Sequence, residues 1–289
     1  MVKNKVLSIA GSDSSGGAGI QADMKTFQEL NVYGMTALTT IVTMDPENYW
    51  EHRTFPQEII TVKEQLRTII EGIGIDAVKT GMLGSVQLID LVSKVIDQHQ
   101  LENIVIDPVL VCKGVTEIMH PETVDSLRDL LIPKATIVTP NLLEAAHLSK
   151  VAPIKSITGM KEAAKIIHDL GPKYVLVKGG SRLAHETALD LLYDGKNFKY
   201  IQSERFQTDH IHGAGCTYSA AIAAELAKGK SVIEAVSIAK LFITEAIRSS
   251  FALNQYVGST NHSAYKKTTN SLEGIVNNEE IKGKRLSSS

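Results

Sequence analysis

Short apolar runs, rich in branched side chains, alternate along the chain with longer segments whose apolar residues recur at helical spacing. Strands are predicted at residues 5–10, 35–43, 77–80, 103–107, 135–139 and 174–178. Helices are predicted between them, at residues 18–30, 57–72, 85–98, 123–131 and 159–170. Because the strands are apolar at nearly every position, both faces of their sheet must be covered. The pattern predicts a doubly wound α/β fold, with a mainly parallel sheet flanked by helices on both faces.

The later part of the chain changes character. Residues 189–193 and 198–201 flank an Asp-Gly pair and predict an antiparallel hairpin. Two alanine-rich segments, at residues 216–228 and 232–250, then predict long helices that pack in the core. No linker interrupts this pattern, so residues 1–265 are expected to form one domain.

Composition narrows the class of protein. The 289 residues are 43% hydrophobic and 21% charged, which suits a large buried core and excludes a disordered or fibrous chain. Because 30 Lys and Arg oppose 32 Asp and Glu, neither nucleic acid nor an anionic membrane is expected as the main partner. With only two cysteines, Cys112 and Cys216, a reducing cytoplasm fits best. No targeting segment is visible, and no apolar run approaches the roughly 18 residues of a membrane span.

A glycine-rich loop, residues 11–19, follows the first predicted strand. The spacing from Gly17 to Ala22 matches the fingerprint of dinucleotide-binding folds. However, polar residues separate the strand from these glycines, and the acidic residue expected about 20 positions later is missing. The loop therefore favours a small-molecule site at the sheet edge, and a dinucleotide-binding oxidoreductase is kept as an alternative.

A second glycine-rich stretch, Gly213-Ala214-Gly215, comes directly before a predicted helix. Backbone amides at such a helix start carry partial positive charge and can stabilise a phosphoryl group during transfer. Cys216 would lie in the first turn, where the pKa of a thiol is lowered, and could accept the proton of a substrate hydroxyl. The alternative is a capped helix with a small buried cysteine.

Polar residues also follow three predicted strands. Asp107 ends one, Lys178 ends another, and Asn141 and Glu144 lie one helical turn apart after a third. Because parallel strands end at one edge of a sheet, these side chains are expected to meet there. Two carboxylates with hydration water suit Mg²⁺ bound to nucleotide phosphates. Taken singly, Asn141 and Glu144 would read only as a helix cap.

Seven motifs together resemble the ribokinase-like superfamily, and within it the hydroxymethylpyrimidine (phosphate) kinases and their pyridoxine kinase members. The motifs lie in residues 10–23, 33–34, 79–83, 107–109, 139–144, 178–180 and 212–216. The resemblance implies ATP- and Mg²⁺-dependent phosphorylation of the 5′-hydroxymethyl group of pyridoxine, pyridoxal and pyridoxamine, by a homodimer. The alternative within the family is phosphorylation of hydroxymethylpyrimidine and its phosphate in thiamine biosynthesis, and one chain can combine both activities.

The resemblance also implies roles for individual residues. Gly213, Ala214 and Gly215 match the anion hole, and Cys216 matches the catalytic base, where most of the superfamily has Asp. The expected ATP-binding residues are Asp107, Asn141, Glu144, Lys178, Gly179, Gly180 and Gly213, of which Asp107 and Glu144 would also bind the metal. The expected substrate-binding residues are Gly11, Asp13, Asp23, Met44 and Cys112.

Two positions depart from the pyrimidine kinases. Met44 stands where those kinases have Gln or Glu, and it offers no partner to an aminopyrimidine. Cys112 stands in the predicted lid at residues 111–114. Both changes resemble the pyridoxine kinase members. One hypothesis is that Cys112 adds reversibly to the aldehyde of pyridoxal, and the alternative is an inert cysteine.

The segment at residues 266–289 loses apolar periodicity and is expected to be a mobile extension outside the domain. Truncation before Thr268 is therefore expected to leave both the melting temperature and kcat unchanged. Thermal unfolding and steady-state kinetics check this expectation. A large loss of either quantity would show that the extension packs against the fold or against another subunit.

Overall fold

The computed structural model of the protein describes residues 3–110 and 121–266. The strands are β1 (Lys5–Asp13), β2 (Tyr33–Asp45), β3 (Glu51–Pro56), β4 (Ala77–Thr80), β5 (Ile104–Ile106), β6 (Ile137–Val138), β7 (Tyr174–Lys178), β8 (Ala188–Tyr193), β9 (Phe198–Ser203), β10 (Phe251–Ala252) and β11 (Gly258–Ser259). The helices are α1 (Gly19–Glu29), α2 (Ile59–Ile70), α3 (Val86–Gln98), α4 (Pro121–Ser126), α5 (Leu142–Ser149), α6 (Ile157–His168), α7 (Ala214–Ala227) and α8 (Val232–Arg248).

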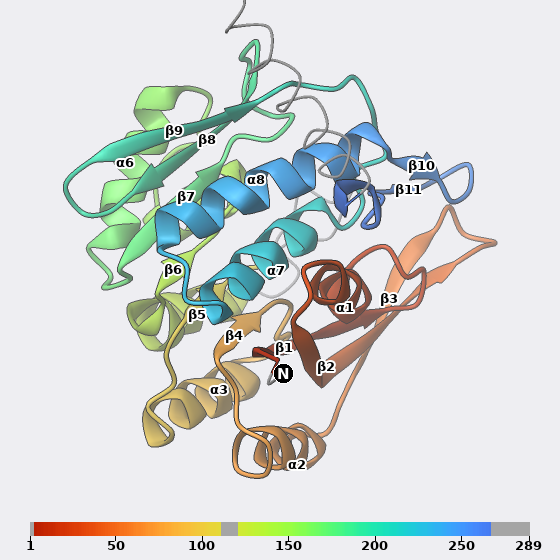
Figure 1. Cartoon of the computed structure of the whole chain (residues 1–289), viewed down its shortest axis with the longest axis vertical. Helices are drawn as coiled ribbons and strands as arrows, with labels where there is room; N and C mark the ends of the chain where they lie inside the picture. Colours follow the sequence, from red (N-terminus) through yellow and green to blue (C-terminus); the bar gives the residue numbers. More distant parts are fainter. Residues whose placement is uncertain (1–2, 111–120, 267–289) are drawn as a thin grey trace, which may run out of the picture.

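Nine strands form one sheet in the order β3-β2-β1-β4-β5-β6-β7-β8-β9, with helices on both faces (Figure 1). The strands from β2 to β7 in this order are parallel, whereas β3 and the pair β8 and β9 are antiparallel to their neighbours. This arrangement confirms the predicted doubly wound α/β fold with a mainly parallel sheet. All carboxyl ends of the parallel strands therefore lie at one edge.

The core has two halves, one on each face of the sheet. Along β1, Leu7 and Ile9 belong to the half beneath α2, α3 and α6, whereas Val6 belongs to the half beneath α7 and α8. Because neighbouring side chains of a strand point to opposite faces, a strand buried on both sides is apolar at most positions. α7 lies against the sheet and is covered by α1 and α8, and its alanines beyond the first turn are buried.

The structure contains elements that the sequence pattern missed, and one predicted helix differs in type. The pattern missed β3 because five of its six residues are mostly exposed, so no apolar alternation marks it. It also missed α5, which appeared in the sequence only as a capping pair. The helix predicted at residues 123–131 is α4 followed by a π-helical turn, Leu127–Leu131. The predicted hairpin is confirmed as β8 and β9.

The register between β1 and β2 shifts between Ala10 and Ser12, where Gly11 of β1 faces two residues of β2, Thr39 and Thr40, so β2 carries a bulge. A side chain at Gly11 would come within 2.9 Å of Thr40 Cγ2 and would have to displace it. Bulges bend a strand and redirect the chain beyond it. The bulge thus lies beside the end of β1, which continues to Asp13 before the chain leads to α1.

Two predicted features are not described by the structure. Cys112, in the expected lid at 111–114, and the expected extension beyond Lys266 both lie outside the described residues. Within residues 3–110 and 121–266, no helix is long and apolar enough to cross a membrane.

Candidate active site

A pocket lies at the carboxyl edge of the sheet, where several chain segments meet. The end of β1 contributes Gly11 and Asp13, the hairpin of β2 and β3 contributes Met44 and His52, and β5 is followed by Asp107. The turn before α7 closes the pocket with residues 212–216. The structure thus brings together residues from Gly11 to Cys216, as the position of parallel strand ends predicts.

A second pocket lies on the other side of the same turn. Gly179 and Gly180 line it, together with Lys240 of α8 and the segment 203–206 after β9. The two pockets share their lining residues Asn141, Lys178, Ile211, Ala214 and Gly215. The start of α7 therefore forms a common wall, with one cavity on each side.

The turn before α7 requires glycine at position 213. Gly213 has a left-handed backbone conformation, with φ of 78°, and a side chain there would collide with the carbonyl group of Gly17. A side chain at Gly215, in the first turn of α7, would make only ordinary contacts, 3.4 Å from Lys178 Nζ and 3.9 Å from Asp107 Oδ2. The first amides of a helix have no acceptor within the helix, and although Ala214 N donates to Ile211 O at 3.1 Å, the amide of Gly215 is available to an anion.

Asp107 is the most heavily bonded carboxylate at this wall. Lys178 Nζ lies 3.1 Å from Asp107 Oδ1, and Ser219 Oγ donates to Oδ2 at 3.0 Å. Burial alone would raise the pKa of Asp107, but the charges of Lys178 and Lys79 outweigh it and hold that pKa below its usual value. Burial lowers the pKa of Lys178, but Asp107 and Glu144 outweigh it and raise that pKa. The pair is therefore ionised at neutral pH.

The pKa of Glu144 is raised, whereas that of Asp107 is lowered. Its carboxylate accepts from Asn141 N at 2.8 Å, and Asn141 Oδ1 accepts from the amides of Leu143 and Glu144, so a full capping box begins α5. Burial and the nearby charge of Asp107 raise the pKa of Glu144 to about 7, against the opposing charge of Lys178. A cation bound here would keep Glu144 ionised.

The oxygen ligands at this wall fit a hard divalent cation. Asp107 and Glu144 are buried carboxylates with a single lysine between them, and oxygen ligands are those that Mg²⁺ prefers. Among residues 3–110 and 121–266, no group of three or more His, Cys, Asp or Glu could hold a metal. Two carboxylates are the usual protein share when phosphates supply the other ligands of Mg²⁺.

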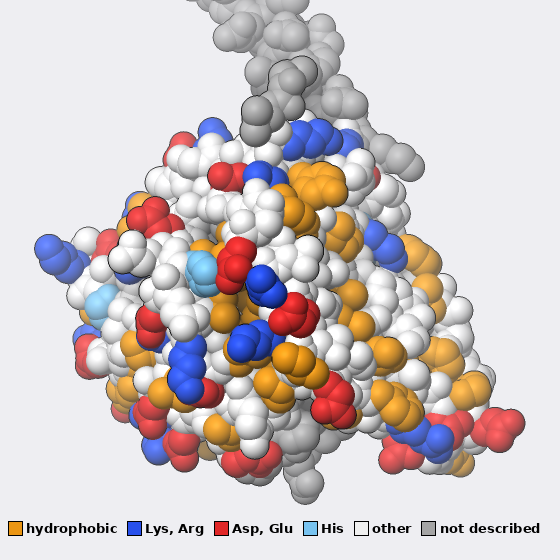
Figure 2. Space-filling view, turned by 90° about the horizontal axis from the view of Figure 1, so that it is seen from below, with side chains coloured by type: hydrophobic (Ala, Val, Ile, Leu, Met, Phe, Trp, Pro, Cys, Tyr) orange, Lys and Arg blue, Asp and Glu red, His pale blue; other side chains and the backbone are white. Residues whose placement is uncertain are grey.

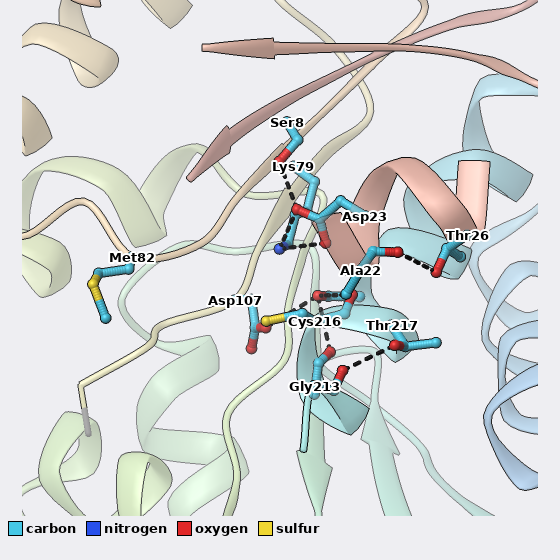
Figure 3. Close-up of polar contacts among 12 residues, drawn as sticks. Ser8, Ala22, Asp23, Thr26, Lys79, Met82, Asp107, Gly213, Cys216 and Thr217 are labelled. Atoms are coloured by element: carbon cyan, nitrogen blue, oxygen red, sulfur yellow. Dashed lines mark hydrogen bonds and ion pairs between the residues drawn. The ribbon is translucent and has the colours of Figure 1, made fainter. Parts of the chain in front are cut away.

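The prediction that the pKa of Cys216 is lowered is wrong. Burial raises the pKa of this thiol to about 11, and although Lys79 opposes it, the carboxylates of Asp23 and Asp107 add to the rise. Figure 3 shows Cys216 in the first turn of α7, with Lys79, Asp23 and Asp107 around it. The effect of the helix start is smaller than the cost of burying a thiolate beside two carboxylates.

Asp23 does not lie where the sequence led us to expect. It was expected on the ring-binding side, but it is fully buried and is not among the residues that line the pocket. Lys79 Nζ lies 2.9 Å from Asp23 Oδ2, and Ser8 Oγ donates to the same atom at 2.6 Å (Figure 3). Asp23 and Lys79 therefore form a buried ion pair beneath the site.

Asp13 joins the two glycine-rich loops. His212 Nε2 lies 2.6 Å from Asp13 Oδ2, which also accepts from Ala18 N at 2.8 Å. Burial would raise the pKa of Asp13, but the hydrogen bond and charge of His212 hold it at about 2. Sequence reasoning did not select His212, although the paired histidines at 210 and 212 were visible in the sequence.

The glycines of the dinucleotide fingerprint have no room for a pyrophosphate. A side chain at Gly17 would meet the imidazole of His212, and one at Gly19 would meet the carbonyl group of Gly11. In a dinucleotide site the second glycine leaves space for the ligand, whereas here the protein itself fills that space. The oxidoreductase alternative therefore has no support in the geometry.

Comparison with known proteins agrees with this arrangement. The phosphomethylpyrimidine kinase family matches residues 13–261. A pyridoxine kinase of Bacillus subtilis is 58% identical over 92% of this chain and 98% of its own length. A hydroxymethylpyrimidine/phosphomethylpyrimidine kinase of the same organism is 39% identical over 92% of this chain and 97% of its own. A structure of pyridoxal kinase from Staphylococcus aureus, in complex with AMP-PCP and pyridoxal, matches with a TM-score of 0.87 and 46% identity, and covers 92% of this chain and 96% of that one.

Together with these relatives, the fold shows an enzyme of the phosphotransferase class, acting on a hydroxyl group. The chain belongs to the phosphomethylpyrimidine kinase family.

The Asp23–Lys79 pair gives a test of stability that is independent of activity. Asp23→Asn or Lys79→Met is expected to lower the free energy of unfolding by about 3–5 kcal/mol, because each leaves one buried charge without its partner. The double variant should recover most of that loss. Breaking the exposed Lys94–Asp90 pair, as a control, should cost less than about 1 kcal/mol. Urea unfolding measures the stability of the two single variants, the double variant and the control. Single variants as stable as the wild type would show that the Asp23–Lys79 pair does not stabilise the fold.

Proposed function

We propose that the protein transfers the γ-phosphoryl group of ATP to the 5′-hydroxymethyl group of pyridoxal, pyridoxine and pyridoxamine. The observation that carries this proposal is the pair of cavities that share the start of α7 as a common wall. A phosphoryl group moving from one cavity to the other must pass the amides of that wall. The similarity to kinases whose structures hold an ATP analogue and pyridoxal supports this choice of donor and acceptor.

In this proposal, the cavity lined by Gly179 and Gly180 takes the nucleotide, and the cavity lined by Met44 takes the ring of the acceptor. Asp107 and Glu144 would hold Mg²⁺, which neutralises phosphate charge when it is bound. Asn141 fixes Glu144 through the capping box. Lys178 faces both cavities and supplies a second positive charge beside Asp107.

Charge that develops on the transferring group would be stabilised by the amides of Gly213 and Gly215 and by Lys178, whereas the amide of Ala214 donates to Ile211 O. Cys216, in the first turn of α7 and lining the acceptor cavity, would take the hydroxyl proton. Because the pKa of its thiol is raised to about 11, only a small fraction is thiolate at neutral pH in the free enzyme. Proton transfer to Cys216 therefore becomes easier as pH rises.

The apolar side chains of the acceptor cavity offer no strong partner to an amino group on a pyrimidine ring. Met44 lies there with Val42 and Met82, and none of these side chains can hydrogen-bond strongly to an aminopyrimidine. Phosphorylation of hydroxymethylpyrimidine or its phosphate is the second candidate, favoured by the family match and by the 39% identical kinase. Both activities in one chain are compatible with the cavity.

We further propose a cytoplasmic homodimer that binds neither nucleic acid nor membrane. β3 is an edge strand of the sheet, and Phe55 on it pairs with Ile41 of β2. Both side chains are exposed, and covering such an apolar strip is a common reason for two copies to associate. Figure 2 shows Lys, Arg, Asp and Glu intermixed on the face seen from below, which is unlike a basic binding surface.

The proposed function is tested by turnover of ATP with a panel of acceptors. Pyridoxal, pyridoxine and pyridoxamine are expected to yield their 5′-phosphates with higher kcat/KM than hydroxymethylpyrimidine and its monophosphate. Higher kcat/KM for the two pyrimidines would favour the second candidate. Absence of turnover with every acceptor would overturn the proposal.

The role of Cys216 is tested by Cys216→Ala. The variant is expected to lose about 10²–10⁴-fold in kcat, as for loss of a general base, with little change in KM for ATP because the amides remain. The wild-type kcat/KM should rise between about pH 7 and 9, since more thiol ionises as pH approaches its pKa of about 11, and the variant should lack this rise. A variant with near-wild-type kcat would show that Cys216 is not the base.

The role of Met44 is tested by Met44→Gln. The amide should pair with an aminopyrimidine, so the kcat/KM of hydroxymethylpyrimidine relative to pyridoxal is expected to rise by about tenfold or more. Met82→Leu keeps the cavity wall apolar and serves as the control, with an unchanged ratio. The same ratio in wild type and Met44→Gln would count against position 44 as the selector.

A further inference from the structure

His52 lies opposite Met44 in the hairpin of β2 and β3, and its side chain lines the acceptor cavity. Residues paired across two strands present their side chains on the same face, so Met44 and His52 form one stretch of the cavity wall. Around them, Val42 and Met82 offer no hydrogen-bond donor. His52 is therefore the polar group in an apolar part of the wall.

The imidazole of His52 is neutral at physiological pH. Burial lowers its pKa, and the positive charge of His212 lowers it further, against a smaller opposing effect of Asp13. A neutral imidazole has one nitrogen that donates a hydrogen bond and one that accepts. Which nitrogen carries the proton depends on the partners of the two.

The surroundings of Nδ1 select the tautomer. Nδ1 is buried and has no hydrogen-bond partner among residues 3–110 and 121–266. A buried N–H without an acceptor is rarer in proteins than a buried acceptor without a donor. The proton is therefore better placed on Nε2, and with Nδ1 enclosed by protein, the edge of the ring that carries Nε2 is left to line the cavity.

From this geometry we infer that His52 is a specificity-determining residue, whose Nε2–H donates a hydrogen bond to the ring oxygen at position 3 of the vitamin B6 acceptors. This inference rests on the proposed function. All three vitamers carry that oxygen, and hydroxymethylpyrimidine has none at the corresponding position. A bond from Nε2–H to this oxygen in its ionised form is charge-assisted and stronger than a neutral one. Met44 then withholds a partner from the aminopyrimidine, and His52 supplies one to the vitamer.

The tautomer is tested first, without any ligand. Nitrogen-15 NMR of the imidazole, assigned by its loss in a His52→Gln variant, should show Nε2 protonated and Nδ1 unprotonated. The opposite tautomer would overturn the inference. This measurement does not depend on turnover, so it separates failure of the inference from failure of the proposed function.

Kinetics test the bond itself with two substitutions. His52→Leu removes the donor, and His52→Gln can place an amide N–H near the position of Nε2. His52→Leu is expected to raise KM for pyridoxal by about tenfold or more and His52→Gln by much less, with KM for ATP unchanged in both. Arg53→Leu, on the neighbouring residue whose side chain is exposed, is the matched control and should leave both KM values unchanged.

An acceptor that lacks the ring oxygen identifies the bonded group. With 3-deoxypyridoxine, wild type and His52→Leu should have similar kcat/KM, because the hydrogen bond is absent in both. An equal loss with pyridoxine and its 3-deoxy analogue would show that His52 contacts another part of the ring, and the inference would be wrong. Melting temperatures of all variants confirm that folding is intact. If the wild type phosphorylates no vitamer, the proposed function fails whatever the tautomer.

Discussion

The whole site depends on the close approach of two loops, one after β1 and one before α7. Gly213 can take its left-handed conformation against the carbonyl group of Gly17 only because it has no side chain. Asp13 and His212 then join the same two loops by a hydrogen bond of 2.6 Å. This contact sets the position and direction of the first turn of α7, and that turn becomes the wall between the two cavities.

Around that wall, buried charges are arranged in compensating pairs. Lys178 neutralises Asp107, and Lys79 neutralises Asp23 beneath them. Glu144 is left with a raised pKa and Cys216 with a protonated thiol. Both groups would respond to added positive charge by ionising, so a bound cation would change the charge of the site. Such preorganisation is what phosphoryl transfer requires of a protein.

Much of the fold and of the candidate site could be predicted from the sequence, and the features that could not be predicted have physical reasons. Asp107, Asn141 and Lys178 were predictable because a parallel sheet brings its carboxyl strand ends to one edge. The burial of Asp23 could not be predicted, because its partner Lys79 lies 56 residues away on an apolar strand. The raised pKa of Cys216 could not be predicted either, because it depends first on the burial of the thiol and then on the charges of Lys79, Asp23 and Asp107 from other parts of the chain. β3 has no apolar pattern in the sequence. The position of His52 on this strand, beside the cavity, could therefore not be predicted.

The central claim is that a phosphoryl group passes directly from one cavity to the other across the start of α7. The most direct measurement is the stereochemical course at phosphorus, using ATP whose γ-phosphorus is made chiral with oxygen isotopes and pyridoxal as acceptor. A single in-line transfer predicts inversion of configuration in pyridoxal 5′-phosphate. Retention would mean two successive transfers through a phosphorylated residue of the protein, and it would contradict the account.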